Sequence, residues 1–190
     1  MKVRDSGMPE ETYWESLFDI PAILAWMNLD HRHSVAELGC GFGTFTIPIA
    51  KAIDGVVHAF DIDPVMLART SERAASLRVE CRERDVLADG FGVRADRVLL
   101  FNILHCDHPV RLLRLAAEAL NLEGQIHVIH WQHRDTPRGP DLSIRPAPQQ
   151  VIEWASEAGL SPVEEARELP PWHYGIKLRN RPISFSVETP

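Results

Sequence analysis

Short apolar runs separated by turn residues set the pattern of this chain. The runs at residues 34–38, 55–60, 96–101 and 125–131 are mainly apolar, and a further run at residues 77–82 alternates apolar and polar positions. Mainly apolar runs predict strands that are covered on both faces, as in a mostly parallel sheet with helices on either side.

Helix-start signals lie between these runs. Asp63 followed by Pro64 is typical of a cap and a first helical turn, and Pro109 opens a second such helix. Thr44 is expected to cap a further helix, and Gly159 to end the last one. The expected helices cover residues 44–53, 63–75, 109–120 and 148–158. Strand, turn and helix therefore alternate, which indicates a doubly wound α/β fold.

The start of the chain has a different character. Residues 9–29 predict two short helices, with Pro9 and Pro21 each in a first turn, where a missing N–H costs nothing. We therefore expect an N-terminal helical segment over residues 1–32, followed by an α/β core over residues 33–180.

The later part of the chain contains one long connection. Residues 132–147 hold four prolines and no regular pattern. A loop of this length in a compact domain is either a stiff surface connection or a lid over a site, and the sequence leaves both open. Residues 163–169 and 174–178 are expected to form a closing hairpin.

Composition narrows the class of protein. A chain of 190 residues holds one well-packed domain, so we predict a single domain over residues 1–190. No apolar run reaches the roughly 18 residues that a membrane helix needs, and the first residues are too polar for a signal peptide. We expect a cytoplasmic protein with no membrane partner. The net charge of −7 disfavours nucleic acid and favours a small-molecule partner.

The strongest chemical signal is the segment 35–44, which reads Val-Ala-Glu-Leu-Gly-Cys-Gly-Phe-Gly-Thr. Glycines between a strand and a helix let the backbone approach a ligand, and the helix start offers amides to a carboxylate. The spacing G-x-G-x-G differs from the G-x-G-x-x-G of the dinucleotide fingerprint. Asp61 ends the next predicted strand, where a carboxylate suits two ribose hydroxyls. These features predict a cofactor site.

With these residues the chain resembles the class I S-adenosylmethionine-dependent methyltransferases, in particular their small bacterial single-domain members. The likeness extends from about Val35 to Gly175 and implies the Rossmann-like methyltransferase fold, with a mostly parallel seven-stranded sheet. It implies that Asp61 holds the ribose and that Ile62 packs on the adenine. The loop that cradles the methionine part of the cofactor would consist of Glu37, Gly39, Cys40, Gly41 and Gly43.

Two further segments are similar to family positions. Asp85 matches an acid that accepts a hydrogen bond from the adenine amino group, and the backbone N–H of Val86 would meet the ring. The alternative for Asp85 is a helix cap. Asn102 follows the fourth predicted strand and, by the same resemblance, contacts the methionine amine.

The substrate side carries no recognisable signature. His105 and His130 are placed by topology at the carboxyl ends of strands, where ligands gather, and are our candidates for a general base. Each imidazole has a structural alternative, a hydrogen bond to the backbone. Candidate substrate contacts from the same end of the sheet are Trp131, His133, Trp172 and His173.

Several other residues are expected to be structural. His127 should be a buried core histidine, and Trp14, Trp26 and Trp154 should pack in the core. No metal is expected, because the histidines and cysteines lack ligand spacing.

We predict methyl transfer from S-adenosylmethionine to an oxygen, sulfur or carbon atom of a small molecule. The alternatives are an RNA or protein methyltransferase and a binding module that transfers no methyl group. The fourth strand lacks the Asn/Asp-Pro-Pro-aromatic segment typical of enzymes that methylate adenine, which argues against a nucleic-acid substrate.

Overall fold

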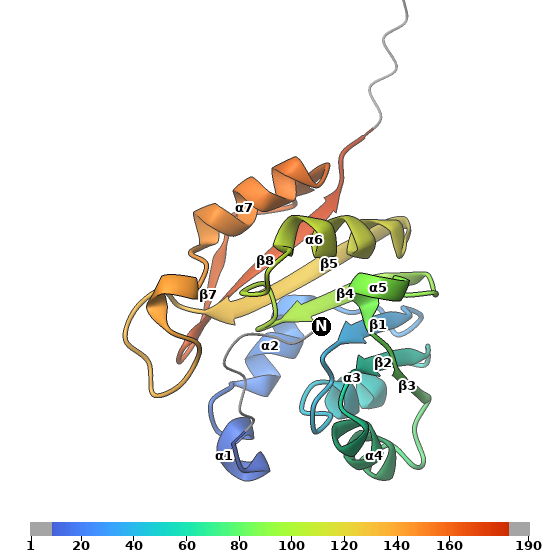
Figure 1. Ribbon diagram of the computed structural model, residues 1–190. Coiled ribbons are helices and arrows are strands. Elements are labelled where there is room, and N and C mark those ends of the chain that lie inside the picture. Colours follow the sequence, from blue (N-terminus) through green and yellow to red (C-terminus); the bar gives the residue numbers. More distant parts are fainter. Residues whose placement is uncertain (1–8, 183–190) are drawn as a thin grey trace, which may run out of the picture.

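A single mixed sheet organises the molecule (Figure 1). The structure is a computed structural model, and it describes residues 9–182. The eight strands follow the order β3-β2-β1-β4-β5-β8-β6, and β7 also pairs with β8. The strands are β1 Val35–Leu38, β2 Val57–Asp61, β3 Val79–Glu83, β4 Ala95–Phe101, β5 Leu120–Trp131, β6 Leu160–Pro162, β7 Arg167–Leu169 and β8 His173–Asn180. The pairs among β1 to β5 are parallel, and β8 is antiparallel to each of its partners.

Helices cover both faces of the sheet, as the sequence predicts (Figure 1). They are α1 Glu11–Glu15, α2 Ile20–Met27, α3 Thr46–Ala52, α4 Pro64–Arg73, α5 Val86–Asp89, α6 Pro109–Glu118 and α7 Pro148–Glu157. Helices α5, α6 and α7 pack on one face, and α2, α3 and α4 lie on the other. Each face of the sheet forms a hydrophobic core with its helices. In β4, Leu100 belongs to the core under α5, α6 and α7, and Leu99 to the core under α2 and α3, because successive strand side chains point to opposite faces.

The antiparallel end of the sheet differs from the sequence prediction in two ways. Gly124 predicts a turn before the last parallel strand, but β5 begins at Leu120 and passes through Gly124 with a register shift. The predicted hairpin is present as β7 and β8, but the short strand β6 was not expected. Strand β8 pairs along one edge with β5 and shares its other edge between β6 and β7.

The helix caps show which local signals hold. Asp63 accepts a hydrogen bond from the Val65 amide and caps α4, as predicted. Thr44 does not cap α3, because this helix starts two residues later with Phe45 at its N-cap. Pro9 precedes the cap residue of α1 and is therefore outside its first turn.

The connection over residues 132–147 is an ordered loop. It contains the 3₁₀ helix η1 (Leu142–Ile144) and is built around Arg145, whose side chain is buried. The Arg145 guanidinium donates to the carbonyl oxygens of Pro140, Gln132 and Arg134 and to the Thr136 hydroxyl. Because one buried cation satisfies so many acceptors, the loop is held without regular secondary structure.

No helix within residues 9–182 is both long enough and apolar enough to cross a membrane.

Candidate functional site

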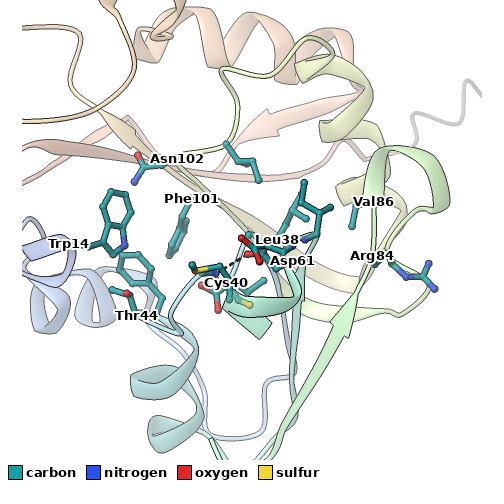
Figure 2. Close-up of a pocket in the computed structure, with 17 residues that line it drawn as sticks. Trp14, Leu38, Cys40, Thr44, Asp61, Arg84, Val86, Phe101 and Asn102 are labelled. Atoms are coloured by element: carbon teal, nitrogen blue, oxygen red, sulfur yellow. Dashed lines mark hydrogen bonds between the residues drawn. The ribbon is translucent and has the colours of Figure 1, made fainter. Parts of the chain in front are cut away.

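A cavity of about 470 Å³ opens at the carboxyl ends of β1, β2 and β4 (Figure 2). After β1 the chain continues to a helix on one face of the sheet, and after β4 it continues to a helix on the other face. A crevice therefore forms between the carboxyl ends of these two neighbouring strands. The cavity is lined by Trp14, Glu37, Leu38, Gly39, Cys40, Gly41, Thr44, Phe45, Asp61, Ile62, Asp63, Met66, Arg84, Val86, Phe101, Asn102 and Ile103.

The glycine turn after β1 forms one wall of the cavity. Gly39, Gly41 and Gly43 all have positive φ angles, of +74°, +55° and +79°. A Cβ atom at Gly39 would lie 3.2 Å from the Ile103 side chain, so only glycine combines this backbone angle with this close approach. Gly43 does not line the cavity; its missing side chain leaves room for Ile47 and Thr70, which favours a packing role.

Asp61 lies at the middle of the cavity and organises the loops around it. One carboxylate oxygen accepts the Gly41 amide at 3.0 Å, and the other accepts the amides of Ile62 and Asp63 at 2.8 and 3.0 Å. A carboxylate has about four acceptor directions and three are used here, so Oδ2 retains capacity for a ligand hydroxyl. Its place at the end of β2 is the one that the sequence predicted.

Glu37 is a buried acid at the floor of the cavity. Its side chain is 2% exposed and accepts a hydrogen bond from the Thr46 hydroxyl. Burial raises the pKa of Glu37 to about 8; the Thr46 hydrogen bond lowers it, and the nearby Asp61 carboxylate raises it. Glu37 is therefore mostly protonated at neutral pH, and it offers a hydrogen-bond donor rather than a full charge.

Asn102 has the features of a binding residue. It adopts a left-handed conformation with φ +54°, which asparagine tolerates better than most residues. Both polar atoms of its amide are buried without a hydrogen-bond partner. Buried polar atoms are normally satisfied, so an orphaned amide in a cavity wall indicates a missing ligand or water. The glycine turn, the Asp61 carboxylate and this amide together fit a cofactor with an amino acid end and a ribose.

The adenine end of the predicted site agrees with the structure in part. Ile62 and Val86 line the cavity, together with Arg84. Asp85 is absent from the cavity wall and caps α5 by accepting a hydrogen bond from the Leu87 amide. The helix-cap alternative therefore describes the geometry of Asp85, and its predicted contact with adenine stays a prediction.

Sequence reasoning missed several cavity residues. Trp14 was expected in the core because of its helical spacing, yet its side chain lines the cavity from α1. No local signal distinguishes these two roles. Thr44, Phe45 and Phe101 adjoin the predicted motifs and could have been found from that proximity. The Thr44 hydroxyl is buried without a partner, which places a second unsatisfied polar group in the wall.

The structure brings His105 and His130 together but keeps both out of the cavity wall. Nδ1 of His105 lies 3.2 Å from Nε2 of His130, and both side chains are buried. Burial, followed by the neighbouring His105, lowers the pKa of His130 well below its usual range. Neither residue lines the cavity, so a catalytic role for either one remains a prediction.

The four predicted substrate contacts also lie outside the cavity wall. His173 is fully buried; its ring stacks on Phe18 at a centroid distance of 4.4 Å and lies tilted against Trp131 at 4.2 Å. His133 bonds through Nδ1 to the Arg145 carbonyl, and Trp172 packs against the core that contains Phe18. Their placement favours packing, and a contact with substrate is not supported by the shape of the cavity.

Metal binding finds no support in the part of the chain that the structure describes. Over residues 9–182, no group of three or more His, Cys, Asp or Glu side chains is arranged to hold a metal ion.

Comparison with known proteins finds a family match over a little less than half of the chain. Residues 35–124 match the family described as "Methyltransferase domain". No curated protein matches the chain by sequence.

Solved structures share the fold at low sequence identity. A SAM-dependent methyltransferase from Aquifex aeolicus aligns with a TM-score of 0.78 at 18% identity, covering 89% of this chain and 93% of that chain. The magnesium protoporphyrin IX methyltransferase from Synechocystis PCC 6803, with SAH bound, aligns with a TM-score of 0.71 at 14% identity, covering 94% and 91% of the two chains. The mitomycin 7-O-methyltransferase aligns with a TM-score of 0.73 at 19% identity, covering 87% of this chain. The present chain spans only 54% of the mitomycin enzyme and 55% of the pyocyanin biosynthetic protein, so it is similar to one part of each.

Proposed function

We propose that this protein methylates a small molecule with S-adenosylmethionine as the donor. Its residues 35–124 match the methyltransferase domain family, and its fold is the Rossmann-like class I methyltransferase fold. The methyltransferase class and the methyl donor predicted from the sequence agree with the family match. The observation that carries the proposal is a single cavity that unites the glycine turn, the Asp61 carboxylate and the unpartnered Asn102 amide.

The residues of this chain would each hold one part of the cofactor. The Asp61 carboxylate would accept a ribose hydroxyl, since Asp61 lines the cavity and its three backbone hydrogen bonds leave an acceptor direction free. The Asn102 amide oxygen would accept from the amino group, and the backbone of the glycine turn would pass along the methionine chain. The proposed cofactor residues that line the cavity are Glu37, Gly39, Cys40, Gly41, Asp61, Ile62, Val86 and Asn102; Gly43 and Asp85 lie outside its wall, and their contacts with the cofactor stay predictions.

The chemistry requires positioning more than proton transfer. When bound, S-adenosylmethionine supplies a methyl group on a positively charged sulfur. The apolar wall formed by Trp14, Phe45, Phe101 and Ile103 would exclude water and hold an acceptor in line. An acceptor atom that carries a proton must lose it during methylation, and the His105–His130 pair is our proposed base. Because neither ring lines the cavity, the proton would reach this pair through a water molecule.

A small-molecule acceptor fits better than a macromolecule. The cavity is a pocket among side chains, and the net charge of −7 opposes a nucleic-acid surface. The mitomycin 7-O-methyltransferase is named for a small-molecule acceptor, which is consistent with the same class here. The cytoplasmic location predicted from the sequence is part of this proposal.

Two measurements test the proposed function. Saturating S-adenosylhomocysteine should raise the melting temperature by about 5–10 °C, the shift expected for a ligand at roughly 100 times its Kd, while NAD should not. Stabilisation by NAD alone contradicts the cofactor assignment. Incubation of the protein and methyl-labelled donor with metabolite pools should then label a small molecule, whereas tight cofactor binding without any labelled product favours a non-catalytic binding module.

A further inference from the structure

The two ends of the cavity differ in chemistry (Figure 2). Trp14, Phe101 and Asn102 lie on one side of Asp61, and Val86 and Arg84 lie on the other. If the ribose lies at Asp61 and the adenine on the Val86 side, the side with Trp14 is left for the methionine part of the cofactor, the methyl group and its acceptor. Phe45 adds another ring to the cavity wall. The acceptor end is therefore walled by aromatic side chains.

These rings are held in place by their neighbours. Trp14 makes an edge contact with Phe18 at a centroid distance of 5.0 Å and with Trp131 at 6.3 Å. Phe45 makes edge contacts with Phe18 at 5.0 Å and with Phe101 at 4.9 Å. Such contacts fix ring orientation, so the aromatic wall is formed before any ligand arrives.

Ion pairs hold the helix that carries Trp14. Arg73 of α4 lies 2.9 Å from Glu11 and 2.8 Å from Glu15, and it also donates to the Phe42 carbonyl in the glycine turn. Arg69 makes a second contact with Glu11 at 2.9 Å. Helix α1 is only five residues long and buries no side chain fully, so these contacts and the Trp14 ring account for its position on the cavity.

Among residues 9–182, the aromatic end of the wall carries two unpartnered polar groups, the Asn102 amide and the Thr44 hydroxyl, and no cation. The Asn102 amide has both a donor and an acceptor without partners, so one can serve the cofactor and the other the acceptor. Arg84 is the one basic side chain that residues 9–182 contribute to the wall; it lies at the far end and donates to the carbonyls of Asp89 and Gly90. An anionic acceptor would lose its hydration here without gaining a cation. A cationic acceptor would meet the positive charge of the donor.

We propose that the acceptor is a neutral, flat aromatic molecule that stacks on Trp14 and accepts a hydrogen bond from Nδ2 of Asn102. Trp14 is then a specificity-determining residue that the sequence alone assigned to the core. This proposal rests on the proposed function and adds the acceptor class to it.

Binding probes test the acceptor class without requiring turnover. The protein is saturated with S-adenosylhomocysteine and titrated with 2-naphthol, with its saturated counterpart 2-decalol, and with anionic 2-naphthoate. We expect 2-naphthol to bind about tenfold more tightly than either of the others, the scale of an aromatic contact. Trp14→Ala should remove this preference, and Trp14→Phe should restore part of it.

A matched control lies on the same helix. Tyr13 is 43% exposed and is absent from the cavity wall, so Tyr13→Ala should keep the preference for 2-naphthol. Two results overturn the acceptor assignment but leave the proposed function standing. One is equal affinity of the wild type for 2-naphthol and 2-decalol; the other is an unchanged preference for 2-naphthol in Trp14→Ala with S-adenosylhomocysteine still bound. Failure of the wild-type protein to bind S-adenosylhomocysteine counts against the proposed function itself.

Discussion

At the scale of single residues, Asp61 combines a structural task with a proposed binding task. Its carboxylate accepts three backbone amides, one of them from the glycine turn. Asp61→Ala removes both these bonds and the proposed contacts with the ribose. We expect affinity for S-adenosylhomocysteine to fall by about 1.5–3 kcal/mol, the scale of lost hydrogen bonds to a charged acceptor. Calorimetric titration measures this, with the exposed Asp54→Ala as the control; equal affinities in the two variants contradict the assignment.

Glu37 should make stability fall on the alkaline side. Its pKa is raised from 4.5 to about 8 in the folded protein, so the folded state holds the proton more tightly than the unfolded state. The stabilisation from protonated Glu37 is complete below about pH 4.5 and is lost as the pH rises through 8. Between these values the free energy of unfolding should fall by roughly 1.4 kcal/mol per pH unit at most.

Glu37→Gln isolates this contribution, because an amide does not titrate. Urea unfolding from pH 5 to 8 should show a flatter profile for Glu37→Gln than for the wild type. The exposed Glu83→Gln on β3 is the control and should keep the wild-type slope. Parallel profiles for Glu37→Gln and the wild type are the contrary result.

The histidine pair invites a kinetic test once an acceptor is known. If His105 or His130 removes the acceptor proton, at least one of His105→Ala and His130→Ala should lower kcat by roughly 100-fold. Affinity for S-adenosylhomocysteine should stay within a few fold of the wild-type value, and kcat should no longer show the pH dependence that the titration of the base produces. The control is His58→Ala, at a residue that contacts Glu80 and does not line the cavity. A loss of melting temperature with unchanged kcat indicates the structural alternative for both rings.

At the scale of elements, the loop over residues 132–147 depends on one side chain. Arg145→Leu would leave buried carbonyls, including those of Pro140 and Gln132, without donors. We expect a loss of roughly 2–4 kcal/mol of unfolding free energy. Urea unfolding measures it, with the exposed Arg111→Leu on α6 as the control.

The same loop also bears on the lid hypothesis. No residue of 132–147 lines the cavity in this structure, so a lid role requires the loop to move during turnover. Shortening the loop within 135–139 should then lower kcat more than cofactor affinity. A folded, shortened variant with unchanged kcat identifies the loop as a surface connection.

At the scale of the whole molecule, buried histidines should make the protein sensitive to acid. His127, His130 and His173 are fully buried, and burial lowers the pKa of each; for His173 it falls to about 3. Because these folded pKa values lie below the usual 6.5, the unfolded chain binds protons first as the pH falls. Their contribution is complete above about pH 6.5 and is lost as the pH falls toward the folded values.

His173→Phe tests this acid sensitivity. Phenylalanine keeps an aromatic ring against Phe18 and Trp131 but does not titrate. Urea unfolding at pH 7, 6 and 5 should show a shallower loss of stability than in the wild type. His31→Phe, at an exposed position, should leave the slope unchanged. Identical slopes for His173→Phe and the wild type would exclude His173 as a source of acid sensitivity.

The sequence by itself determined the parallel part of the fold and the cofactor end of the site. Mainly apolar runs, proline and aspartate at helix starts, and the glycine turn followed by Asp61 are local patterns whose physical meaning does not depend on distant residues. This is why β1 to β4 and the cap at Asp63 agree with expectation. Local signals were less reliable for Thr44 and Gly124, where the final geometry depends on the packing of the turn and on the register with β4.

Only the tertiary structure decided which side chains share the cavity. Trp14 lies 23 residues before Glu37, and nothing in its helical spacing tells whether its face meets the core or a ligand. His130 reaches His105 because β5 pairs in register with β4, while His173 is buried because β8 pairs antiparallel with β5. Contacts between distant segments follow from the packing of the whole sheet, so they become visible only when the chain is folded.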